Sequence, residues 1–228
     1  MTRTALASVI SAMALAAAML AAPPAMAGVN LVVGMPISFK HSTCSLGFFA
    51  FDRRKDRLAV TAGHCGEAIH EPVYNKWGQQ FGEIVARMPD RRDGDGRLIG
   101  SRGYTIIYLY DNFSLEPFFT RTGSIGEGDR VTKVAARSGK TSGQITKVVA
   151  NARPDLALLY SDMVQLRGDS GGPWLIGKQP VLVGMGSSGN QEREGRDATC
   201  QGQPISSLVE LIRNTAGRYA DGFTVWTE

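Results

Sequence analysis

Short apolar runs separated by turn residues are the feature that most restricts the fold of this 228-residue chain. Each run has the length of a β-strand, is rich in β-branched or aromatic residues and ends at Gly, Asp, Asn or Pro. The runs are Leu46–Phe51, Leu58–Ala62, Phe81–Ala86, Tyr104–Tyr110, Arg130–Ala135, Gln144–Ala150, Leu156–Tyr160 and Val181–Gly186. Many short strands with regular turns predict an all-β barrel or sandwich.

A helical period appears only near the end of the chain. After Pro204, the apolar side chains of Leu208, Val209, Leu211 and Ile212 recur on one face of a helix. Ser206 or Ser207 is placed to cap this helix, and Gly217 is placed to end it. We therefore predict one C-terminal helix after the strands.

The first 27 residues predict a cleaved signal peptide rather than part of the fold. Arg3 gives a positive start, residues 5–22 are all apolar or small, and Ala25-Met26-Ala27 supplies the small residues of a cleavage site. The alternative is a membrane anchor, since the run is just long enough to span a bilayer. Its alanine-rich composition and the two prolines that close it favour cleavage. We expect a secreted protein, cut near Ala27, that is extracellular or in the cell envelope and is not held in a membrane.

Charge and cysteine content exclude some functions. The chain has 25 basic and 21 acidic residues, and the basic residues are scattered, so no nucleic-acid partner is expected. An exported protein with three cysteines can form one disulfide. Cys44 and Cys65 bracket a predicted hairpin and are the natural pair, which leaves Cys200 without a partner in the chain.

Two short motifs carry chemistry. Gly168-Asp169-Ser170-Gly171-Gly172-Pro173 places a serine in a glycine-rich turn, where a sharp bend can expose the hydroxyl and direct backbone N–H groups at one point. Thr61-Ala62-Gly63-His64-Cys65 places a histidine after an apolar strand, beside a cysteine that a disulfide can fix. A serine needs a rigidly held base, so we predict that Ser170 is a nucleophile and His64 its general base. His41 and His70 lack such a setting.

These motifs together resemble the chymotrypsin-like serine proteases. The stretches Cys44–Phe48, Arg137–Gly143, Gly184–Asn190 and Gln203–Ile205 extend the resemblance over nearly the whole mature chain and indicate the bacterial streptogrisin-like branch. The resemblance implies two antiparallel six-stranded β-barrels with a C-terminal α-helix, the first barrel over residues 28–118 and the second, with the helix, over 119–228. It implies a monomeric serine endopeptidase that acts on protein or peptide substrates through an acyl-enzyme and needs no cofactor.

Several site residues follow from the same resemblance. The N–H groups of Gly168 and Ser170 would form the oxyanion hole, and buried Asp169 would pair with Arg137. Ser187, Ser188 and Gly189 would line the specificity pocket and pair with the substrate backbone. The base of that pocket holds Val164 and no acid, so an apolar residue before the cut bond is expected.

The third member of a catalytic triad is the main departure from the family. The aspartate expected before Tyr104 is replaced by Gly103. Asp93 and Asp95 lie in a flexible loop just upstream and could fold back toward His64, and of these we favour Asp95. A His64–Ser170 pair without an acid is the alternative. Asp111 lies too far along the strand, and Asp155 belongs to the second barrel.

Two further expectations concern this loop and the activity. An acid two residues before Asp93 and a glutamate near the loop's end would be needed for calcium, and those places hold Arg91 and Arg102, so no metal is expected. The alternative function is a weak or inactive protease-fold protein that binds peptides in its cleft. Gly103 favours that alternative, and the intact His64 and Ser170 favour the enzyme.

Overall fold

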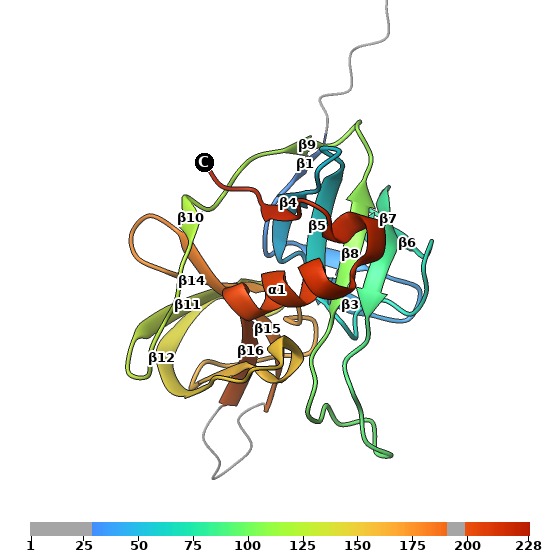
Figure 1. The fold of residues 1–228 in the computed structure, drawn as a ribbon. Helices are drawn as coiled ribbons and strands as arrows, with labels where there is room; N and C mark the ends of the chain where they lie inside the picture. Colours follow the sequence, from blue (N-terminus) through green and yellow to red (C-terminus); the bar gives the residue numbers. More distant parts are fainter. Residues whose placement is uncertain (1–28, 191–198) are drawn as a thin grey trace, which may run out of the picture.

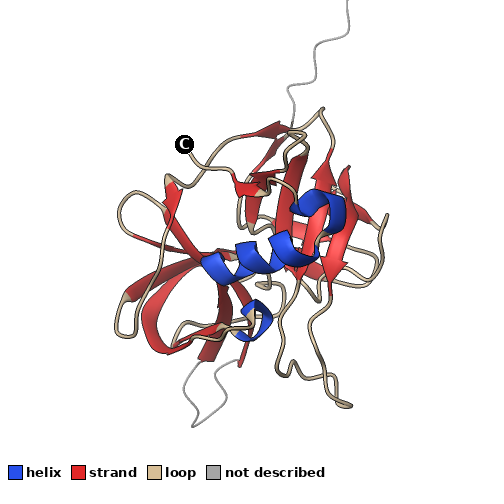
Figure 2. Cartoon of the chain, in the orientation of Figure 1, coloured by secondary structure: helices blue, strands red, loops and turns tan. Residues whose placement is uncertain are grey.

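The computed structural model describes residues 29–190 and 199–228, so the predicted signal peptide lies outside the described residues. Most of the regular secondary structure in the described residues is β-strand, as predicted (Figure 2). Two sheets lie side by side, and the helix α1 (Ile205–Thr215) crosses in front of them in Figure 1. No helix in these residues is both long and apolar enough to cross a membrane.

The first sheet contains eight strands in the order β17-β4-β5-β8-β7-β6-β2-β3. Their bounds are β2 Pro36–Ser38, β3 Thr43–Ser45, β4 Phe48–Phe51, β5 Arg57–Ala62, β6 Pro72–Asn75, β7 Gln80–Met88, β8 Tyr104–Leu109 and β17 Thr224–Val225. The C-terminal β17 pairs with β4, so the end of the chain returns to the sheet that its beginning forms. A parallel pair, β1 (Asn30–Leu31) and β9 (Ser114–Leu115), lies outside both large sheets.

The second sheet closes on itself. The strands pair in the order β10-β15-β14-β11-β12-β13-β16, and β16 pairs again with β15, which makes a ring of six strands with β10 added beside it. Their bounds are β10 Arg121–Thr122, β11 Arg130–Ala135, β12 Gly139–Val149, β13 Leu158–Ser161, β14 Pro173–Ile176, β15 Val181–Asn190 and β16 Thr199–Pro204. The predicted six-stranded barrel is confirmed here. The first sheet has more strands than predicted, and its end strands do not pair within the described ranges.

All eight predicted strand runs are strands, although their ends differ by a few residues. The predicted Leu156–Tyr160 run is divided, because Pro154–Leu156 forms a short 3₁₀ helix, η1, before β13 begins. Short strands such as β2, β3 and β6 were not predicted, since two to four residues carry too little alternation to be recognised.

The predicted C-terminal helix is confirmed, with a correction at its start. It begins at Ile205 after Pro204, one to two residues before the predicted serine caps, and no side chain caps it. Gly217, just beyond the C-cap Ala216, has φ +59°, a left-handed conformation that glycine adopts without strain. A second 3₁₀ helix, η2 (Gly217–Ala220), follows.

The core explains why the two halves are held together. Leu208, Leu211 and Ile212 of α1 belong to the same buried cluster as the first-sheet residues Phe48 and Tyr104, and this cluster also includes Met185 of the second sheet. A second, smaller cluster around Trp174 fills the closed barrel. The shared cluster fixes the two sheets against each other, as a site built from both of them requires.

Candidate active site

The Ser170 loop joins β13 to β14 in the second sheet. Gly168 and Gly171 have φ values of +102° and +88°, which other residues adopt only with strain. A Cβ atom on Gly171 would also overlap Thr61 Oγ1 and the carbonyl oxygen of Ser45 from the first sheet. The glycines of the motif therefore permit both the sharp turn and the close approach of the two sheets.

His64 lies two residues after the end of β5 in the first sheet, in a turn that hydrogen bonds and a disulfide hold. The N–H of Cys65 donates to the carbonyl of Ala62 at 3.1 Å, and Thr105 Oγ1 donates to the same carbonyl at 3.1 Å. Cys65 forms the predicted disulfide with Cys44, which is confirmed. The sulfurs of Cys44 and Cys65 lie near His64 but are bonded to each other, so they are not thiolates that could bind a metal ion. The disulfide instead supports the turn that carries His64.

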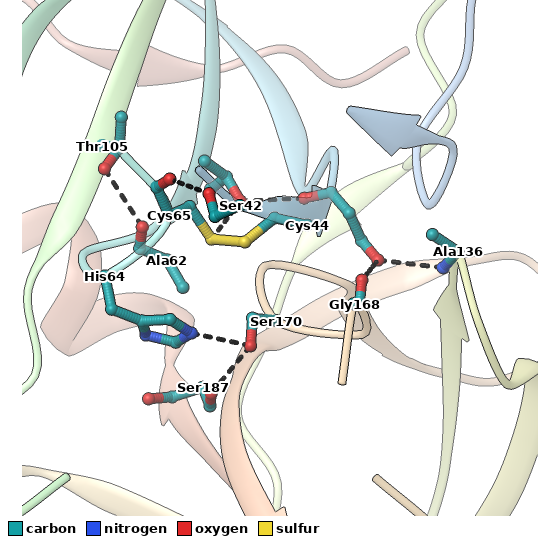
Figure 3. The surroundings of a disulfide bond; sticks show 12 residues. Ser42, Cys44, Ala62, His64, Cys65, Thr105, Ala136, Gly168, Ser170 and Ser187 are labelled. Carbon is teal, nitrogen blue, oxygen red and sulfur yellow. Dashed lines mark hydrogen bonds between the residues drawn. A yellow bond between two sulfur atoms is a disulfide. The ribbon is translucent and has the colours of Figure 1, made fainter. Parts of the chain in front are cut away.

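The two predicted catalytic side chains meet. His64 Nε2 lies 2.7 Å from Ser170 Oγ, and Figure 3 shows the imidazole directed at the serine hydroxyl. Ser170 Oγ is also 3.2 Å from the carbonyl oxygen of Ser187 in β15. A serine hydroxyl has one hydrogen, so the shorter contact with His64 is the one suited to proton transfer.

The other imidazole nitrogen contacts Asp90, a residue that the sequence analysis did not consider. His64 Nδ1 lies 2.6 Å from Asp90 Oδ2, and the carboxylate side chain is almost fully buried. The N–H of Gly103 donates to Asp90 Oδ1 at 2.6 Å. A carboxylate at Nδ1 requires a proton there, which leaves Nε2 free to accept the proton of Ser170.

Gly103 explains why the acid comes from a different strand. In the β7–β8 ladder Met88 is opposite Tyr104, so the residues just past the end of β7 lie beside those just before β8. A Cβ atom at Gly103 would overlap the carbonyl oxygen of Met88. An aspartate therefore does not fit at residue 103 in this backbone, and Asp90 supplies its carboxylate from the neighbouring strand end.

The expectation that Asp95 reaches His64 is corrected. The Asp95 side chain is 74% exposed and lies 3.6 Å from Arg97. Asp93 Oδ1 accepts the N–H groups of Asp95 and Arg97, so it stabilises the turn of its own loop. The other rejected acids are also elsewhere, since Asp111 pairs with Arg57 and Asp155 with Arg153. The sequence signal for Asp90 was only an acid two residues after a strand, directly following Pro89, and this signal does not show that the residue lies beside His64.

The oxyanion donors expected at Gly168 and Ser170 lie in the turn beside the nucleophile. Among the hydrogen bonds of the described residues, neither N–H group donates to a protein acceptor. Ser45 holds this turn from the first sheet: its N–H donates to the carbonyl of Ser170 and its hydroxyl to the carbonyl of Gly168, each at 2.8 Å.

Asp169 pairs with Lys133 and not with Arg137 as expected. Lys133 Nζ lies 2.8 Å from Asp169 Oδ2, and both side chains are fully buried. The Arg137 side chain is exposed, and only its backbone N–H reaches Asp169 Oδ1, at 3.1 Å. Lys133 was recognisable as a charge at an inward position of β11, where Val131 and Ala135 on the same face are buried.

The hydrogen bonds to Asp169 keep it ionised. Burial alone would raise the pKa of Asp169, but hydrogen bonds from Lys133 and from the N–H groups of Leu166 and Ser138 outweigh it and lower that pKa. The pair thus holds the residue before Ser170 as an anchored carboxylate.

The expected substrate-binding residues lie on one wall beside Ser170. Ser187, Ser188 and Gly189 belong to β15, and Gly189 is exposed at its surface. The carbonyl of Val164 accepts a hydrogen bond from Lys133 at 2.6 Å. Gln165 Oε1 accepts from Lys133 Nζ at 2.8 Å and from Cys200 Sγ at 3.1 Å.

Cys200 is a buried part of this wall rather than a reactive group. It forms no disulfide. Burial raises the pKa of the Cys200 thiol to about 12, which keeps it protonated and unreactive at neutral pH.

Comparisons with known proteins agree with this geometry. No protein-family model matches the chain. Serine protease 2 of Streptomyces fradiae is 28% identical over 167 residues, which cover 64% of this chain and 88% of that protein. Thermobifida fusca protease A has a similar structure, with a TM-score of 0.66 and 21% identity over 88% of this chain and 100% of that one.

Two further solved structures share the fold. A glutamic acid-specific serine protease, described as using a histidine triad in substrate binding, has a TM-score of 0.64 and 20% identity over 86% of this chain and 100% of that one. The Nocardiopsis protease has a TM-score of 0.63 and 18% identity over 87% of this chain and 100% of that one. With the His64–Ser170 geometry, these similarities support the assignment of the chain as a chymotrypsin-like serine protease of the bacterial type, a serine endopeptidase.

Proposed function

We propose that the protein is a secreted endopeptidase that cleaves peptide bonds through an acyl-enzyme on Ser170, with His64 as general base and Asp90 as the acid of the triad. One observation carries this proposal. A continuous row of side chains runs from Asp90 Oδ2 to His64 Nδ1 at 2.6 Å and from His64 Nε2 to Ser170 Oγ at 2.7 Å.

In the first half of the reaction, Ser170 Oγ attacks the substrate carbonyl carbon while its proton moves to His64 Nε2. The imidazole becomes positive, and the Asp90 carboxylate stabilises that charge and holds the ring. The N–H groups of Gly168 and Ser170 would donate to the developing oxyanion, a contribution of about 10²–10³ in rate for each donor.

In the second half, His64 gives its proton to the leaving amine, and the carbon–nitrogen bond breaks. A water molecule then attacks the acyl-enzyme and loses its proton to His64 Nε2. His64 returns that proton to Ser170 Oγ as the ester bond breaks, which releases the acid product and restores the enzyme. Each proton transfer uses the His64 imidazole, which Asp90 would hold in place throughout the reaction.

Protein or peptide is the proposed substrate. Residues Ser187 to Gly189 lie on β15 at the nucleophile, where an extended peptide can add as a further strand. Val164 and the absence of an acid beside it in sequence support an apolar residue before the cut bond. Secretion after cleavage near Ala27, and action as a monomer, remain part of the proposal on the sequence pattern alone.

The test is labelling by a fluorophosphonate probe. The purified mature protein should be labelled at Ser170 and should cleave peptides, and Ser170→Ala should lose both properties. Folded protein that remains unlabelled over a broad pH range would overturn the enzyme mechanism. The alternative, a peptide-binding protein without turnover, predicts that result. The argument for this alternative was that Gly103 stands where the triad acid is expected. The contact of Asp90 with His64 removes that argument, because a carboxylate reaches His64 from another residue.

A further inference from the structure

The carboxylate of Asp90 lies in the connection between β7 and β8 and not in a strand. It accepts two hydrogen bonds, one from His64 Nδ1 and one from the N–H of Gly103. Beyond Asp90 the connection is a narrow arm held by its own backbone, as in the bond from Arg91 N–H to the carbonyl of Ser101. The position of the Asp90 carboxylate therefore depends on what fixes Gly103 at the base of this arm.

Arg102, the residue before Gly103, is 2% exposed and ties that base to the second barrel. Its N–H donates to the carbonyl of Asp155 at 2.8 Å, and its own carbonyl accepts from Gln203 Nε2 at 3.3 Å. Both partners belong to the half of the chain that carries Ser170. The Arg102 carbonyl and the Gly103 N–H belong to the same planar peptide group. The hydrogen bonds of Arg102 therefore fix the direction of the N–H that donates to Asp90.

The guanidinium of Arg102 extends the same connection to the substrate-binding wall. Its Nη2 donates to Gln201 Oε1 at 2.9 Å and lies 3.4 Å from Ser188 Oγ, while Nη1 donates to the carbonyl of Gly100 at 3.0 Å. Ser188 Oγ donates to the same Gln201 oxygen at 2.9 Å. Only a planar, forked group makes these contacts at once.

Charge supports this placement. Burial lowers the pKa of Arg102, and attraction to Asp90 and to Tyr160 of β13 acts in the opposite direction. Among the described residues, His64 contacts the Asp90 carboxylate directly, and Arg102 lies near enough to attract it.

We propose that Arg102 is a positioning residue that sets Asp90 against His64 and couples the acid to Ser188 in the substrate wall. It touches neither substrate nor the reacting atoms, and it acts through the Gly103 N–H and the Gln201–Ser188 pair. The inference rests on the proposed function, in which Asp90 is the acid of the triad.

The experiment compares Arg102→Lys, Arg102→Met and the control Arg57→Met in full mature protein, with active sites counted by fluorophosphonate labelling. Arg57 also bonds through its guanidinium to backbone carbonyls, of Tyr110 and Phe113, but it lies at the opposite end of β5 from His64. Misplacement of a catalytic group by about 1 Å can lower the rate by about 10²-fold. We expect kcat per labelled site to fall by about 10²-fold in Arg102→Met, by less in Arg102→Lys, and not at all in Arg57→Met.

The Nδ1 proton resonance of His64, observed by NMR of protein labelled with ¹⁵N-histidine, separates positioning from a general loss of structure. A displaced Asp90 carboxylate weakens the hydrogen bond at Nδ1, so this resonance should move upfield in Arg102→Met, move less in Arg102→Lys, and stay in place in Arg57→Met. Arg102 variants that are less stable but turn over like wild type, with an unmoved resonance, would overturn the proposal. If they do not fold, Gln201→Leu, which removes the acceptor from the other barrel, must lower kcat or the proposal fails. Absence of labelling in wild type would instead refute the proposed function.

Discussion

The two sides of the active site are held in different ways. Ser170 lies in a turn whose conformation is encoded by its own neighbours, since Gly168 and Gly171 take positive φ and Asp169 is anchored directly beside it. Asp90 lies in a connection between strands, and the donor that holds it, Gly103, is 13 residues away in sequence. The proposed nucleophile thus belongs to a local motif, whereas the position of the proposed acid depends on the pairing of two strands. The first can therefore be recognised in the sequence, and the second only from the register of the strands.

The largest expected effect separates Asp90 from Asp95. Replacement of the triad acid by its amide leaves the geometry intact but favours the wrong imidazole tautomer, and it lowers kcat by about 10⁴-fold in the family. We expect a loss of that order in Asp90→Asn and none in Asp95→Asn, measured as kcat on a peptide substrate with counted active sites. Equal activity of the two variants would show that the acid side has no catalytic part.

The nucleophile side should respond most strongly to the loss of its buried ion pair. Lys133→Met leaves Asp169 as an uncompensated buried charge, which should cost about 3–5 kcal/mol of unfolding free energy. Arg137→Met is the matched control and should change stability little, because the Arg137 side chain is exposed. Denaturant unfolding at pH 7 measures both, and a larger effect at Arg137 would contradict the pairing.

The same pair predicts a pH dependence. Because the pKa of Asp169 is lowered in the folded state, its stabilisation is complete above the unfolded value of about 3.9 and is lost as the pH falls through the lower folded value. The stability difference between wild type and Lys133→Met should therefore be large at pH 7 and shrink below about pH 4. A difference that stays constant down to pH 2 would show that Asp169 does not carry it.

Gly103 tests the close approach of the two strand ends. Gly103→Ala places a methyl group against the carbonyl of Met88, and overpacking of this kind costs about 1–3 kcal/mol or more. Gly94→Ala, in the same connection, has no atom within 4 Å of the added group and should be nearly neutral. Thermal unfolding and kcat are the measurements, and both should fall only in Gly103→Ala. Similar results for the two variants would contradict the close packing that excludes an acid at residue 103.

Ser45 joins the two sides, and its removal should give the smallest effect. In Ser45→Ala the N–H of Ala136 and the carbonyl of Gly168 lose their partner, which should cost about 1–3 kcal/mol and reduce kcat modestly. The control Ser142→Ala removes an exposed hydroxyl that bonds only to Thr132 and should be neutral. A neutral Ser45→Ala would mean that the hydrogen bond from the Ser45 backbone N–H to the carbonyl of Ser170 suffices to hold this turn.

The sequence predicted the parts of this site that are local. His64, Ser170 and the Cys44–Cys65 disulfide follow from short strings whose composition is tied to one conformation. Asp90 could not be identified in this way, because its place depends on the register that sets Met88 opposite Tyr104, with a bulge between Ile84 and Ala86.

Lys133 is an intermediate case. Its inward position on an alternating strand indicated a buried charge, but only the packed structure shows that Asp169 is its partner. Arg137 was expected instead because the resembled family branch has an arginine at the matching position as the partner of this carboxylate. Partners of buried charges therefore need three-dimensional information even when the charge itself is recognisable.

The central claim is that Asp90 holds the far nitrogen of His64. The most direct test is proton NMR of protein labelled with ¹⁵N-histidine, which observes the Nδ1 proton of His64 itself. A hydrogen bond to a carboxylate predicts a strongly downfield resonance in wild type that is lost or moved upfield in Asp90→Asn and unchanged in Asp95→Asn. A resonance that survives in Asp90→Asn and disappears in Asp95→Asn would contradict the account.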